Sequence, residues 1–229
     1  MDNYLLSLIQ LCDSNLPTGA FSHSFGLETY IQEDRVFDKK TFSNWLKVFL
    51  EEQLVYSDGF ACRLTYDMLE EGRDFQDIWR LDRMITMQSL PRETREAGQK
   101  MGERMLVLGM ALYDFPELSL YKDRIDKMLS FGHPAIVFAM IARHLGVPKF
   151  TAMSTFLYST ISGLVQNAVR GIPLGQTAGQ QILIESQSHL VDAVKKIDSL
   201  SEDDFGVTSP GLELSQMKHE RLNIRIFMS

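Results

Sequence analysis

Apolar residues recur at helical spacing along almost the whole chain, which leaves little of it for strands. Residues three and four apart lie on one face of an α-helix, whereas a half-buried strand alternates apolar and polar residues. Such alternation is scarce here. The spacing predicts an all-α, single-domain helical bundle of about eight to ten helices. The clearest stripes are Leu5/Leu8/Ile9/Cys12, Phe42/Trp45/Leu46/Phe49, Met101/Met105/Leu108/Leu112 and Val137/Met140/Ile141/His144.

Charge and apolar content limit the classes of partner. Hydrophobic residues make up 45% of the 229 residues, which is enough for a sizeable core. The formal net charge is −7, and lysine and arginine form no stripe. Because affinity for nucleic acid depends on clustered basic residues that neutralise phosphates, we expect no nucleic-acid partner.

No feature of the sequence directs the chain to a membrane or an oxidising compartment. The longest apolar run, Pro134 to Ala142, is about half of the roughly 20 residues that a membrane-spanning helix needs. Residues 1–4 carry no positive charge of the kind that begins a secretory signal. Cys12 and Cys62 form no CxxC motif. We expect a cytoplasmic protein that contacts no membrane.

One shift in composition divides the chain. Residues 199–210 (SLSEDDFGVTSP) are acidic, small and turn-forming, and they predict a flexible joint between a helical body, residues 1–198, and a C-terminal segment, residues 211–229. That segment is too apolar to remain in water, so it docks either on its own body or on a partner. We expect partner docking, with a mobile or loosely docked segment in the free chain. Its apolar residues are Leu214, Met217, Leu222, Ile224, Ile226 and Phe227.

The sequence lacks the common motifs of catalysis and of nucleotide or metal binding. It contains no G-x-x-x-x-G-K-[ST] loop for phosphates, no HExxH and no Cys/His cluster, so we expect no cofactor, no metal site and no catalytic residue. Ser22 and Ser24 flank His23, but neighbours in sequence do not form a nucleophile–base pair. A stand-alone helical enzyme remains one alternative function. A convergent cluster of polar side chains in a deep cavity would favour it.

A mixed-charge stretch begins another expected helix. It contains Arg92, Glu93, Arg95 and Glu96. We interpret it as a helix start exposed to solvent, and the less favoured alternative is a charged rim that meets a partner.

Three longer stretches are more distinctive than an ordinary helical pattern. They are LPTGAFSHSFGLE at 16–28, VRGIPLGQTAGQ at 169–180 and MKHERLNIRIFMS at 217–229. In this order and spacing they resemble signatures of the urease accessory protein UreF family, and GHPAIVFAMIARHLGV at 132–147 resembles a fourth, weaker one. Ile226 stands where leucine is commoner in the family pattern.

The resemblance implies an all-α homodimer that is not an enzyme and that assists nickel insertion into apo-urease. It implies that the C-terminal segment binds a second accessory protein, UreD (also called UreH), and that the pair recruits the GTPase UreG. A direct regulator of that GTPase is the alternative function. The resemblance places the UreD-facing group at His219, Glu220, Arg225, Phe227 and Ser229, and a dimer or GTPase surface at Tyr158, Gly175 and Gln176.

Overall fold

The computed structural model describes residues 4–228, and over this range the prediction of an all-α fold is confirmed. The α-helices are α1 (Leu5–Leu11), α2 (Leu27–Gln32), α3 (Lys39–Val48), α4 (Asp58–Glu70), α5 (Phe75–Gln88), α6 (Arg92–Leu112), α7 (Pro116–Asp126), α8 (Pro134–His144), α9 (Lys149–Gly171), α10 (Gln176–Ser199) and α11 (Pro210–His219). Two short 3₁₀ turns are η1 (Ala20–Ser22) and η3 (Glu202–Asp204), and the π-helix η2 (Phe49–Leu54) continues α3.

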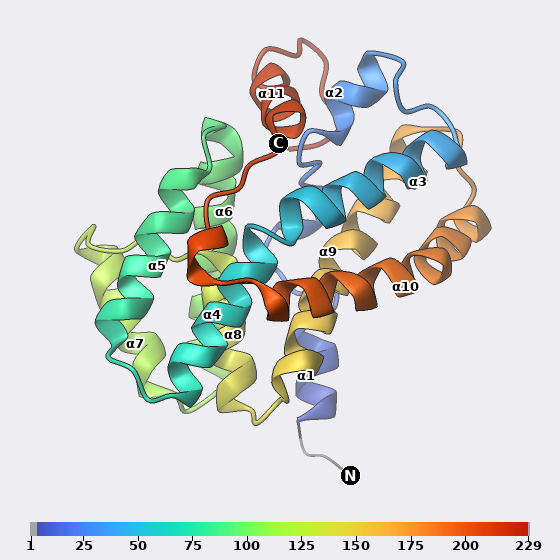
Figure 1. Ribbon diagram of the computed structural model, residues 1–229. Coiled ribbons are helices and arrows are strands. Elements are labelled where there is room, and N and C mark those ends of the chain that lie inside the picture. The colour runs from blue at the N-terminus through green and yellow to red at the C-terminus, as the bar shows by residue number, and fades with distance from the viewer. Residues whose placement is uncertain (1–3, 229) are drawn as a thin grey trace.

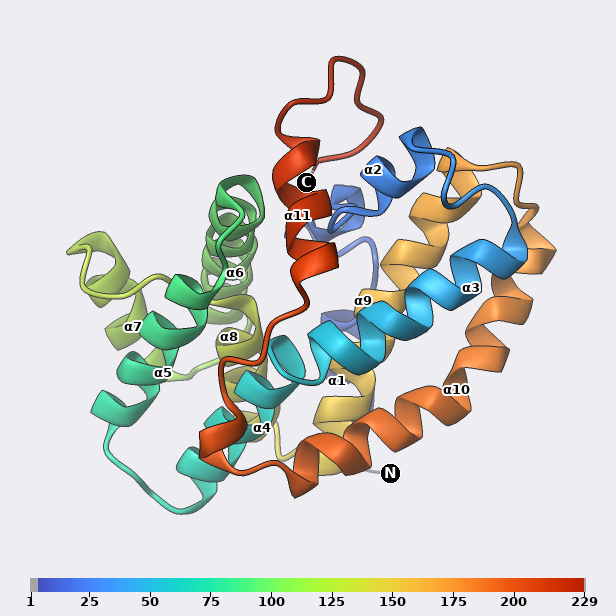
Figure 2. The ribbon, with the colours of Figure 1, turned by 45° about the horizontal axis from the view of Figure 1, so that its top comes forward.

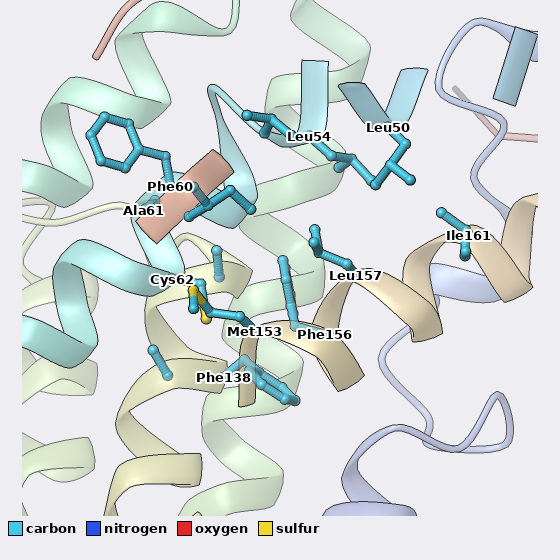
Figure 3. Close-up of a cluster of buried hydrophobic side chains, with 14 of the residues drawn as sticks. Leu50, Leu54, Phe60, Ala61, Cys62, Phe138, Met153, Phe156, Leu157 and Ile161 are labelled. Carbon is cyan, nitrogen blue, oxygen red and sulfur yellow. The ribbon is translucent and has the colours of Figure 1, made fainter. Parts of the chain in front are cut away.

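Helix α8 forms the centre of the bundle. Every residue from Ala135 to Ala142 is buried, so this helix is apolar on all sides, whereas its sequence stripe indicated one apolar face. Helices α4, α6 and α9 pack around it. Figure 3 shows side chains of α4, α8 and α9, among them Phe60, Phe138 and Leu157, meeting in one apolar cluster.

The remaining helices lie on two sides of this centre (Figure 1). Helices α5, α6 and α7 lie on one side, and α3, α9 and α10 lie on the other. Helix α11 packs beside α2 and also contacts α6, so the C-terminal segment bridges the two sides. Within the described residues, no helix has the length and apolar character needed to cross a membrane.

The acidic joint contacts the body at several points. An Arg63 guanidinium nitrogen donates to the Leu200 carbonyl (2.8 Å), Arg73 pairs with Glu202 (3.2 Å), and the Ser209 hydroxyl donates to the Glu52 carbonyl (2.8 Å). These partners are far away in sequence, so composition alone gives no sign of them. The division into body, flexible joint and partner-docking segment stays a prediction.

Candidate partner-binding site

The stretches at 16–28 and 217–229 meet each other and the first residues of the stretch at 169–180, between α2, α9 and α11. Figure 2 shows α11 between α2 and α6, with the last residues of the chain running back toward α2. The buried Asn167 side chain of α9 donates to the His23 carbonyl (2.7 Å). Residues 226–228 in turn bond to Ser22, Ser24 and Glu28. We call this convergence the tail-docking site.

Gly26 allows α11 to approach α2 closely. Its φ of 85° is a left-handed conformation that glycine adopts without strain. A Cβ atom at this position would lie 2.2 Å from the Ser215 hydroxyl. On the next turn of α2, the Thr29 hydroxyl donates to the Ser215 carbonyl (2.7 Å). The motif at 16–28 therefore provides the surface on which α11 rests.

The Glu28 carboxylate lies at the centre of the tail-docking site. Its side chain is 1% exposed, and a buried carboxylate is stable only when several donors bond to it. One oxygen accepts from the Ile226 amide (2.6 Å), and the other accepts from the Phe227 amide (3.1 Å) and contacts His219 Nε2 (2.9 Å). Three donors from the C-terminal segment thus bond to one side chain of α2.

His219 joins Glu28 to a second carboxylate. Its ring is fully buried, with Nδ1 at 3.4 Å from Glu93 and Nε2 against Glu28. Both ring nitrogens thus face carboxylate oxygens, one from α2 and one from α6. Arg225 donates to both Glu93 oxygens, at 2.9 and 3.1 Å. Two side chains of the C-terminal segment, His219 and Arg225, thereby contact two carboxylates of the body.

Glu220 supplies a cap that the start of α6 otherwise lacks. The N-cap residue of α6 is Pro91, whose side chain makes no capping hydrogen bond. A Glu220 oxygen accepts from the amides of Arg92 (3.0 Å) and Glu93 (3.3 Å). A carboxylate at this end also interacts favourably with the helix dipole. Residues 92–96 do begin α6, and the Arg92 side chain is 64% exposed, but the amides of Arg92 and Glu93 in addition bind the C-terminal segment.

The last residues form a short parallel bridge. Met228 donates its amide to the Ser22 carbonyl and accepts from the Ser24 amide, both at 2.8 Å. The Phe227 ring is buried, with the Arg170 guanidinium 5.1 Å from its centroid. A Cβ atom on Gly171 would lie 3.2 Å from this ring. The end of α9 thus lies directly against the Phe227 ring.

The structure places the predicted partner-binding residues on the body of their own chain. His219, Glu220, Arg225 and Phe227 all contact it, which differs from the expected loose segment. The difference arises because their polar partners, Glu28 and Glu93, are distant in sequence. Whether a partner also contacts these residues stays a prediction.

The other predicted residues lie elsewhere. Tyr158 lies in the middle of α9 and is 41% exposed. Gly175 and Gln176 lie exposed at the start of α10. Ser229 is outside the described residues. Within residues 4–228, Tyr158, Gly175 and Gln176 make no hydrogen bond with the tail-docking site.

Docking leaves a row of apolar side chains exposed to solvent. Ile224 is 78% exposed, Ile226 is 62% exposed and Met228 is 56% exposed. The residues between them, Arg225 and Phe227, point to Glu93 and to the end of α9. We call Ile224, Ile226 and Met228 the outward row. Several exposed apolar groups so close together in the chain are typical of a protein-binding surface.

The geometry gives little support to a stand-alone enzyme. A cavity of about 200 Å³ is lined in part by Asp58, His133 and Glu213. The Asp58 carboxylate lies 3.9 Å from His133 Nε2, beyond hydrogen-bond distance, and burial lowers the pKa of His133. The Ser22 hydroxyl donates to the Gly19 carbonyl, and Ser24 is fully buried. Among the described residues, no three His, Cys, Asp or Glu side chains are grouped to hold a metal ion.

No role was predicted for Glu28 or Asn167 from the sequence, and Glu93 was placed in a mixed-charge helix start whose less favoured interpretation was a rim that meets a partner. Glu28 is the last residue of the motif at 16–28, which the sequence identifies only as a family signature. The available signal was that this motif, the α9 end and the C-terminal segment all carry a family signature. Three such stretches are expected to meet when they serve one site, and Glu28 and Glu220 are the glutamates within them.

Acid is expected to weaken tail docking through Glu93. Burial raises its pKa, but hydrogen bonds from Arg225 and His219 outweigh burial and hold the pKa below its ordinary value of 4.5. The stabilisation is therefore complete above that value and is lost as the pH falls through the lowered pKa. Following the Phe227 amide signal by NMR from about pH 6 to about pH 3 measures this loss. In a Glu93→Gln variant this component of the acid response should disappear, and its persistence would contradict the assignment.

Comparisons with known proteins decide the family. A family model described as UreF matches residues 36–187, which is more than half of the chain. A protein named urease accessory protein UreF from Lachnoclostridium phytofermentans is 58% identical over all 229 residues, covering 100% of both chains. The chain belongs to the UreF family of urease accessory proteins. A second UreF relative, from Bacillus sp. strain TB-90, is 50% identical and covers 99% of this chain and 100% of its own.

Membership in the UreF family bears on the site in two ways. The relatives are named accessory proteins, and the chain is accordingly a maturation factor rather than an enzyme. The family-model match stops at residue 187, before α11, but both relatives align along the full length. The tail-docking site therefore lies within the aligned region of the UreF relatives.

Proposed function

We propose that this chain is a non-catalytic scaffold for urease maturation. It binds the accessory protein UreD (UreH) through its C-terminal segment, and the pair recruits the GTPase UreG, so that the assembly inserts nickel into apo-urease. The proposal includes a homodimer that acts in the cytoplasm. Tyr158, Gly175 and Gln176 are proposed for the dimer or GTPase surface.

The observation that carries the proposal is the outward row. Binding of a partner is favoured by roughly 25 cal/mol for each Å² of exposed apolar surface that the partner covers. Ile224, Ile226 and Met228 already lie on an ordered backbone, so a partner that covers them orders little additional chain. Leu214 of α11 is also exposed and provides further apolar surface on the same segment.

Charging the outward row is expected to abolish capture of UreD. In an Ile224→Asp/Ile226→Asp variant, two carboxylates would be buried without partners against the accessory protein, which is strongly unfavourable. Both side chains face solvent in the free chain, so its helicity and melting temperature should stay near those of the unchanged protein. Co-expression with the cognate UreD and affinity capture measure the effect.

A matched control is Leu120→Asp, which places the same charge at an exposed apolar residue of α7. The control should leave capture unchanged. If the double variant also captures UreD as the unchanged protein does, the outward row is not the UreD-binding surface.

A further inference from the structure

We infer that Glu28 is the positioning residue of the partner-binding segment. Its buried carboxylate holds the backbone of residues 226 and 227 so that the outward row faces the partner. This inference rests on the proposed function, and it assigns a role to a residue that lies outside the segment itself.

Glu28 accepts hydrogen bonds from two adjacent backbone amides. The amides of Ile226 and Phe227 follow each other in the chain, and each bonds to one oxygen of the same carboxylate. Two successive backbone amides form a small anion-binding concavity. Both bonds can form only for one local orientation of the backbone, so Glu28 sets the direction of the side chains on either side.

This backbone orientation separates the side chains of Phe227 and Ile226. With the amides turned toward α2, the Phe227 ring enters the space beside Gly171, and Ile226 is left 62% exposed. From the same helix, the Gln32 side chain donates to the Ile224 carbonyl (2.7 Å). Helix α2 therefore contacts the backbone at both isoleucines of the outward row and leaves their side chains exposed.

The Glu28 carboxylate differs from a neutral side chain of the same size in the strength of its hydrogen bonds. Glu28 receives three donors while 1% exposed, and hydrogen bonds to a charged group are stronger than neutral ones. Glutamine has nearly the same size and retains one acceptor oxygen, but its amide nitrogen would oppose a donor. If Glu28 acted only by packing, the change to glutamine would leave the segment in place. If its charge positions residues 226 and 227, the change would release them.

The test is amide hydrogen exchange of the full-length free chain, read at residues 226 and 227. Glu28→Gln should raise exchange at both amides by about tenfold or more, because a hydrogen bond to a charged group is lost. Capture of UreD should weaken in parallel, while the helicity by circular dichroism stays unchanged. Unchanged protection at these amides would overturn the inference, as would lost protection with undiminished capture.

Two further variants keep the result interpretable. Glu33→Gln removes an exposed carboxylate from beside the same helix, where it pairs with Lys218 (2.6 Å), and it should leave exchange at 226 and 227 unchanged. Ile226→Pro removes one donor without altering α2, and it should speed exchange at Phe227 even if Glu28→Gln proves unable to fold. Equal protection in this proline variant and the unchanged chain would also overturn the inference.

The inference and the proposed function fail separately. The exchange measurement uses the free chain and needs no partner, so it tests positioning alone. The charged outward-row variant leaves Glu28 intact, so it tests the partner surface alone.

Discussion

Phe227→Ala is expected to release the last residues of the chain from the body and to abolish UreD capture. Truncating a buried phenylalanine to alanine typically costs about 3–5 kcal/mol. For a terminal segment, that cost lowers the equilibrium constant for docking by roughly two orders of magnitude or more. It does not unfold the bundle. The ring is buried beside Gly171 on its own chain, so the variant acts on capture without removing a side chain of the outward row.

Exchange at the Met228 amide, which bonds to the Ser22 carbonyl, reports the release directly. A matched control is Phe37→Ala, which removes an exposed phenylalanine from the connection between α2 and α3. The control should leave both the Met228 amide and capture unchanged. Full protection at Met228 in the Phe227→Ala variant would show that the ring does not anchor the segment.

Gly26→Ala is expected to displace α11 from α2. The φ of 85° costs an alanine about 1–2 kcal/mol, and its Cβ would lie 2.2 Å from the Ser215 hydroxyl. The nearby Gln216 amide nitrogen, 3.2 Å from the same Cβ, prevents simple accommodation because it belongs to the backbone. The expected result is a loss of several kcal/mol in α11 docking, with fast amide exchange throughout α11.

Gly146→Ala is the matched control for backbone strain. Gly146 has a φ of 75°, and no atom lies within 4 Å of its Cβ position. The alanine should therefore destabilise the chain only through its left-handed backbone conformation. The α11 amides should stay protected from exchange. Equal effects of the two variants on α11 exchange would contradict the close approach of α11 to α2.

The helices were predictable because each one is a local pattern. The stripe of Phe42, Trp45 and Leu46 depends on residues within two turns, and those residues are buried in α3. Burial on every side of α8 was harder to predict, because a continuous apolar run does not show how many neighbours surround it. Family signatures indicated the C-terminal segment as functional, and they correctly placed the chain in the UreF family.

The tail-docking site was less predictable because its interactions join residues far apart in the chain. Glu28 and Glu93 are ordinary glutamates in the sequence, and only the fold places both beside His219. An apolar segment after an acidic joint indicates that docking occurs, but it does not identify the docking surface. The burial of Phe227 between the exposed Ile226 and Met228 accompanies backbone bonds to α2, which no local pattern encodes.

The most direct test of the central claim is the set of nuclear Overhauser effects from the Phe227 ring protons in the free chain. The ring lies against Gly171 and beneath the Arg170 guanidinium, so cross-peaks to the protons of both residues are predicted. Cross-peaks restricted to Phe227 and its sequence neighbours would show that the segment does not dock on its own body, and would contradict a preformed surface for UreD.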